Sequence, residues 1–116
     1  LLDEILELEN TDHQWRSRMA ARFIQGVVQE GQTYLLTNLV KDQTQRIQQA
    51  QAIWVIGRDR KAALPIPDKR LSRCHAAIQY VCNQGFYLVD LNSTNGSFVN
   101  GEPVRQAQYL RDGDQI

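Results

Sequence analysis

Cysteine is scarce in this sequence of 116 residues, and its two copies, Cys74 and Cys82, form no CxxC motif. They lie on either side of what reads as a single strand, so an intrastrand disulfide between them is geometrically unfavourable. The chain also has only 2 histidines, which leaves too few ligands of the usual kind for a zinc site. We therefore expect reduced thiols, as in a cytoplasmic protein, and no metal or other cofactor.

Long apolar runs and an excess of one charge are missing as well. No stretch approaches the roughly 20 apolar residues that span a bilayer, and no secretory signal is visible. The 13 basic and 13 acidic residues cancel to a formal net charge of zero, whereas a general nucleic-acid binder is usually basic. These absences predict a cytoplasmic protein without membrane insertion and without a nucleic-acid partner.

What the sequence does contain fits one soluble globular domain. Its hydrophobic content is 42% and its charged content is 22%, and 116 residues suffice for one modest core. Neither Leu1 nor Ile116 looks like a natural terminus, so we expect a piece of a longer polypeptide.

Residues 1–30 carry apolar side chains at helical spacing, and Gly31 follows as a helix stop. The pattern predicts an N-terminal helical arm over residues 1–30. Such an arm would cover a sheet edge, join another domain or form a homodimer through its apolar face. The residues that set this spacing are Leu1, Ile5, Leu8, Trp15, Met19, Phe23 and Val27.

After Gly31 the pattern changes to short β-type runs separated by turn residues. "AIWVIG" at 52–57 reads as a buried strand with Trp54 in the core, and "HAAIQYVC" and "GFYLVDL" read as two more. Asn100-Gly101 is a hairpin signal. This spacing is typical of an all-β sandwich.

Three strand-to-loop junctions carry the polar residues of interest. They are Gly57-Arg58, the run from Ser72 to His75, and "DLNSTNG" at 90–96. Loops at one end of a sandwich gather at a common surface, so these junctions should converge. Their guanidinium, hydroxyl and amide groups are donors, which is the set that binds a phosphate. The donors expected to meet there are Arg58, Ser72, Arg73, Thr94 and Asn95.

Ser72 and His75 have a second interpretation, as the nucleophile and base of a hydrolase. A triad also needs a carboxylate that orients the histidine and an oxyanion hole, and the sequence has no G-x-S-x-G elbow. We therefore predict that the protein is not an enzyme and that His75 is a hydrogen-bonded structural residue.

The four motifs "IGR", "LSRCHA", "FYLVDLNSTNGSFVNG" and "LRDGDQI" together resemble the forkhead-associated (FHA) domain, in its bacterial form, across about residues 33–116. The resemblance implies a β-sandwich of eleven strands that binds phosphothreonine peptides through loops at one end. The family continues past "GDQI" with two more strands, so the domain assigned to residues 31–116 is expected to be truncated at its C-terminal end.

The resemblance also implies roles for individual residues. Arg58 and Ser72 would bind the phosphate, with Arg73 beside them. Thr94 would lie near the phosphothreonine, and Asn95 would hold the peptide backbone.

Further roles concern the framework and the specificity of the site. Gly57, His75 and Gly96 would be framework residues. Arg70 would contact the third residue after the phosphothreonine, or would instead pair with Asp68. The expected function is phosphorylation-dependent binding of a partner protein. The alternative is a structural or oligomerisation module that binds without phosphate, as some members of the family do.

Overall fold

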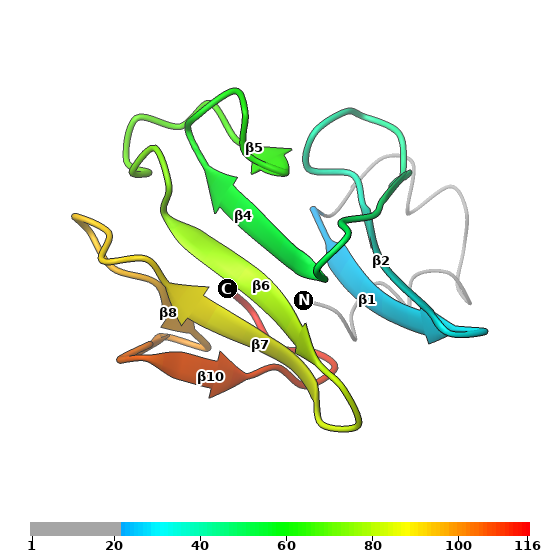
Figure 1. The fold of residues 1–116 in the computed structure, drawn as a ribbon. Coiled ribbons are helices and arrows are strands. Elements are labelled where there is room, and N and C mark those ends of the chain that lie inside the picture. The colour runs from blue at the N-terminus through cyan, green and yellow to red at the C-terminus, as the bar shows by residue number, and fades with distance from the viewer. Residues whose placement is uncertain (1–21) are drawn as a thin grey trace.

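The structure of the protein, a computed structural model, describes residues 22–116 (Figure 1). Within this range the chain forms ten strands and no helix, so the prediction of an all-β fold is confirmed. The strands are β1 (Ile24–Gln29), β2 (Gln32–Thr37), β3 (Gln45–Ile47), β4 (Ile53–Gly57), β5 (Leu64–Pro65), β6 (Ala76–Val81), β7 (Gly85–Asp90), β8 (Phe98–Val99), β9 (Glu102–Pro103) and β10 (Ala107–Tyr109).

The strands form three sheets. One has the order β1-β2-β3, the second has the order β10-β7-β6-β4-β5, and β8 and β9 make a small hairpin. All pairs are antiparallel except β4 and β5. A single apolar core joins all three sheets through Leu35 of β2, Trp54 of β4, Leu88 of β7 and Val99 of β8, among others. This is the two-layer construction of a β-sandwich.

The helical arm predicted for residues 1–30 is wrong where the structure can test it. Residues 24–29 form strand β1, which pairs with β2 over its whole length. Glu30 and Gly31 both have positive φ, 51° and 77°, as a two-residue type I′ hairpin requires, so Gly31 turns a hairpin rather than ending a helix. The β-structure thus begins at Ile24. The rest of the predicted arm, with its suggested dimerisation, lies outside the described residues.

Trp54 lies in the core, as predicted, and fixes the strand that leads to the site. Its side chain is fully buried, and its indole Nε1 donates a hydrogen bond to the carbonyl of Ile47, 3.0 Å away. Burying a tryptophan with its one polar atom satisfied stabilises the domain without an unpaired donor. Strand β4 is therefore firmly placed, and its last residue, Gly57, directly precedes Arg58.

The hairpin turn predicted at Asn100-Gly101 is present. Asn100 and Gly101 connect β8 to β9, and residues 82–84 connect β6 to β7. Residues 22–116 contain no helix that is long and apolar enough to cross a membrane. Cys74 and Cys82 are both free and exposed.

Candidate functional site

Three loops meet at one end of the five-stranded sheet. Because β4 and β7 run antiparallel to β6, the last residues of β4 and β7 and the first residues of β6 lie at the same end of the sheet (Figure 1). The loops are residues 58–63, residues 66–75 and residues 91–97. The convergence predicted from the three junctions is therefore present in the fold.

The first and second loops are bound together through the main chain. The amide of Arg58 donates to the carbonyl of Ser72 at 3.1 Å, and its Nε donates to the carbonyl of Leu71 at 3.2 Å. This approach is possible only because the preceding residue is glycine. A Cβ on Gly57 would lie 2.0 Å from the carbonyl oxygen of Arg73, which is far inside any allowed contact.

The carbonyls of residues 70–73 all accept hydrogen bonds from the neighbouring loops. Besides the two from Arg58, the amide of Asp59 donates to the carbonyl of Arg73 at 3.1 Å. From the third loop, Nδ2 of Asn95 donates to the carbonyl of Arg70 at 2.7 Å. The Asn95 side chain is exposed but fixed in direction, with its Oδ1 left for another donor. Four consecutive carbonyls thus hold Arg58, Asp59 and Asn95.

Ser72 connects the second loop to the third through its side chain. Its Oγ accepts a hydrogen bond from the amide of Thr94 at 3.0 Å and lies 3.5 Å from the Thr94 hydroxyl. Two hydroxyls and the exposed Arg58 therefore come from three loops to one surface. Hydroxyls and guanidinium groups are suitable donors for the oxygens of a phosphate.

His75 is buried beneath the loops, and its ring forms hydrogen bonds to the second loop and to the third. Its Nδ1 accepts from the amide of Ser72 at 3.0 Å, so the neutral ring carries its proton on Nε2, which donates to the carbonyl of Gly96 at 2.8 Å. The Ser72 hydroxyl bonds to Thr94 and not to His75. The pair is therefore not arranged as a nucleophile and its base.

Asp90, at the end of β7, organises the third loop and was not predicted as a site residue. Its Oδ1 accepts from the hydroxyls of Ser93 and Ser97, each at 2.6 Å, and its Oδ2 accepts from the amide of Ser93 at 3.1 Å. Burial raises the pKa of Asp90, but these hydrogen bonds and the nearby His75 outweigh it, so the pKa is lowered overall. An Asp three residues before a Ser, as in Asp90 and Ser93, is a spacing at which the carboxylate can accept a hydrogen bond from the main-chain amide of the Ser, and it could have indicated this role from the sequence.

Arg70 pairs with Asp68, as the second of the two interpretations held. Its Nη2 lies 2.7 Å from Oδ2 of Asp68, and its Nε donates to Oδ1 at 3.1 Å. This bidentate pair lowers the pKa of Asp68 to about 2. Arg73 is more loosely held, because its Nη2 lies 4.0 Å from the nearest oxygen of Asp59.

Comparison with known proteins places this geometry in a family. The sequence model of the FHA domain matches residues 54–116, which is more than half of the chain. The chain belongs to the FHA family. The match spans Gly57 and the whole second half of the sandwich, so the resemblance noted from the four motifs is confirmed.

Curated relatives of this FHA chain include two proteins of Mycobacterium tuberculosis. It is 47% identical over 62 residues to the FHA domain-containing protein FhaA of Mycobacterium tuberculosis, covering 53% of this chain and 11% of that protein. It is 39% identical over 66 residues to the glycogen accumulation regulator GarA of Mycobacterium tuberculosis, covering 57% of this chain and 40% of that protein. The chain thus spans well under half the length of these relatives.

Solved FHA structures share the fold. One comes from an analysis of phosphothreonine-dependent FHA domain interactions, with a TM-score of 0.53, 36% identity and coverage of 78% of this chain and 79% of that one. Another is EmbR of Mycobacterium tuberculosis in complex with a low affinity phosphopeptide, with a TM-score of 0.58, 30% identity and coverage of 76% and 23%.

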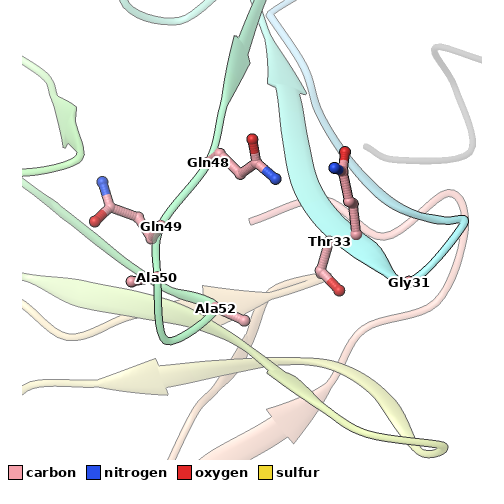
Figure 2. A pocket seen from close by; sticks show the side chains of 7 residues that line it. Gly31, Thr33, Gln48, Gln49, Ala50 and Ala52 are labelled. Atoms are coloured by element: carbon pink, nitrogen blue, oxygen red, sulfur yellow. The ribbon is translucent and has the colours of Figure 1, made fainter.

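The FHA domain also has a hollow away from the three loops, between the start of β2 and the chain that enters β4 (Figure 2). It measures about 450 Å³ and is lined by uncharged side chains, among them Thr33, Gln48 and Gln49. Figure 2 shows Gln48 and Thr33 on either side of it. Without a cationic group it is a poor site for an anion, whereas the loop surface carries Arg58 and Arg73.

Proposed function

We propose that this FHA domain is a non-enzymatic module that binds phosphothreonine peptides and thereby joins proteins in a phosphorylation-dependent way. The observation that supports it most is the meeting of Arg58, Ser72 and Thr94 on one exposed surface, each from a different loop. In this proposal Arg58 and the Ser72 hydroxyl bind the phosphate, and Arg73 adds a second cation beside them. Thr94 lies against the phosphothreonine.

The charge of this region fits such a ligand. Residues 58–73 contain six basic residues and two acidic ones, a formal charge of +4 in a chain whose net charge is zero. A phosphorylated side chain carries about −1.5 to −2 charges at pH 7, and a hydrogen bond to a charged group contributes about 1.5 to 3 kcal/mol. Three or four such bonds, less the ordering costs, give roughly micromolar affinity, which suits reversible signalling.

Asn95 has a separate role in the proposal. Its Nδ2 is already bonded to the carbonyl of Arg70, which leaves Oδ1 to accept a hydrogen bond from a peptide amide. A fixed acceptor of this kind orients the peptide main chain with little loss of side-chain entropy. Gly57, His75 and Gly96 would be framework residues, because they allow or make the contacts that hold these loops together.

The relatives support the same reading. The FHA structure from the phosphothreonine-dependent study and the EmbR phosphopeptide complex both share this fold. The rival function is a structural module that binds its partner without phosphate. Nothing in the three loops specifically favours this phosphate-independent function. One measurement distinguishes it from phosphopeptide binding.

That measurement is binding of an oriented phosphothreonine peptide library, followed by calorimetry on the best sequence with and without its phosphate. We expect micromolar binding of the phosphorylated peptide and no measurable binding of the matched unphosphorylated one. Equal binding of the two peptides, or no enrichment from the library by the folded domain, would refute the proposed function.

A further inference from the structure

Asp68 pairs with Arg70, the residue that the family resemblance assigns to contact with the third residue after the phosphothreonine. Its carboxylate bonds to Nε and Nη2 of Arg70 at 3.1 and 2.7 Å. The arginine side chain is 85% exposed and the aspartate side chain 33%, so the pair lies on the surface that a bound peptide would cross. The side-on fork of the guanidinium, formed by Nε and Nη2, is therefore already occupied within the chain, which leaves Nη1 and the second proton of Nη2 for a peptide carboxylate.

The same carboxylate also shapes the loop. Oδ1 of Asp68 accepts a hydrogen bond from the amide of Arg70 at 2.9 Å, and the carbonyl of Asp68 accepts from the amide of Leu71 at 3.0 Å. This is an Asx turn closed by a second, main-chain bond. The turn sets the position of the Arg70 carbonyl, which in turn holds Nδ2 of Asn95.

We propose that Asp68 is a specificity-determining residue of this domain, an internal carboxylate that competes with acidic side chains of the peptide for Arg70. This inference rests on the proposed function, because it concerns how the phosphopeptide site discriminates among peptides. It predicts that the intact domain discriminates weakly at the third residue after the phosphothreonine, which is the peptide residue that the family resemblance assigns to Arg70.

The competition is permanent at neutral pH. The pairing with Arg70 lowers the pKa of Asp68 to about 2, so the internal carboxylate is ionised wherever a peptide carboxylate is. It is also covalently part of the same turn, two residues from the arginine, so its effective concentration at Arg70 greatly exceeds that of a dissolved peptide. A peptide acid must therefore either displace Asp68 or bind the remaining Nη donors of a guanidinium whose charge Asp68 already balances.

The experiment uses one library-selected phosphopeptide made in two forms, with Asp or Asn at the third position. The two forms differ in charge and hardly in shape. Calorimetry gives the ratio of their dissociation constants for the unmodified domain, Asp68→Asn, Arg70→Ala and the double variant. Asparagine keeps the Oδ1 acceptor of the turn and loses the charge. Asp59→Asn is the matched control, because it changes the net charge equally at a site that faces Arg73.

We expect a ratio near one for the unmodified domain and a preference for the Asp peptide of about two- to fivefold in Asp68→Asn, the range of an exposed ion pair. The preference should vanish in the double variant and be absent in Asp59→Asn. Equal ratios in the unmodified domain and Asp68→Asn would overturn the inference, as would a preference that survives without Arg70.

A substitute variant and the unphosphorylated peptide distinguish a failure of this inference from unfolding of the variant and from a failure of the proposed function. If Asp68→Asn unfolds, Asp68→Ser retains a side-chain acceptor for the turn without the bidentate partner and takes its place. If the unmodified domain binds the peptide equally well without its phosphate, the proposed function fails. If binding needs the phosphate but Asp68→Asn leaves the ratio unchanged, only the role of Asp68 fails.

Discussion

Replacing Gly57 with alanine tests the main-chain contact on which the first two loops depend. The added Cβ would lie 2.0 Å from the oxygen and 2.7 Å from the carbon of the Arg73 carbonyl, and 3.0 Å from the carbonyl oxygen of Ser72. Favourable contacts between such atoms begin at about 3.5 Å, so the second loop has to retreat by roughly 1.5 Å. The obstacle is backbone, which cannot rotate aside as a flexible side chain can.

The retreat would cost the domain two kinds of free energy. It breaks the bonds from the amides of Arg58 and Asp59 to the second loop, each worth about 0.5 to 1.5 kcal/mol net. It also repacks a filled region, which typically costs about 1 to 3 kcal/mol. We therefore predict that Gly57→Ala lowers the free energy of unfolding by about 2 to 6 kcal/mol. Phosphopeptide binding should be lost even where the variant remains folded, because Arg58 and Ser72 move apart.

Urea unfolding followed by tryptophan fluorescence measures the first effect, and calorimetry at low temperature measures the second. Gly31→Ala is the control, because a Cβ there meets nothing within 4 Å but has a φ of 77°. That variant should lose about 1 to 3 kcal/mol through backbone strain and keep its affinity, since Gly31 lies in the hairpin turn remote from the loops. The reasoning is refuted if Gly57→Ala unfolds at the urea concentration of the unmodified domain and binds as tightly.

Three other predictions follow from the same surface. Arg58→Ala should abolish phosphopeptide binding measured by calorimetry while lowering the free energy of unfolding by at most about 1.5 kcal/mol, since its exposed side chain donates a hydrogen bond to the carbonyl of Leu71; full affinity in the folded variant would contradict its role. A phosphothreonine peptide should bind up to about fourfold more tightly than its phosphoserine counterpart if the extra methyl is buried, and equal affinities would count against a fitted pocket. Because hydrogen bonds from Ser93 and Ser97 lower the pKa of folded Asp90, its stabilising effect is complete above the ordinary carboxyl pKa and is lost as pH falls below about 4. The urea midpoint should therefore drop less steeply with acid in Asp90→Asn than in the unmodified domain, and parallel curves would remove this account of the loop.

Much of the second half of the fold could be predicted from the sequence, because its signals are local. The run around Trp54 is apolar and short, and Asn100-Gly101 is a turn that few other residues can make. The convergence of Arg58, Ser72 and Thr94 followed from strands that alternate in direction. The contacts that carry the site agree with that placement.

The first half was harder, because an apolar spacing of four residues runs into β1, which begins at Ile24. Phe23 and Val27 are four apart, which favours a helix, yet the strand forms because β2 offers a partner that no local window reveals. The sequence suggested Asp68 only as a partner of Arg70, and the roles of Asp68 and Asp90 in shaping their loops were missed for a related reason. A search for phosphate donors directs attention to cations and hydroxyls, whereas these carboxylates act on the loops that carry them.

The four carbonyls of residues 70–73 have a consequence for how such a domain can acquire new partners. They hold Arg58, Asp59 and Asn95 by main-chain atoms, which every amino acid supplies, while the side chains of Lys69 and Arg70 are exposed. Preference for the peptide can therefore be rewritten at these exposed positions while the groups that grip the phosphate stay in place. A library randomised at positions 69 and 70 on an otherwise fixed chain is accordingly a direct route to retargeted variants of this domain.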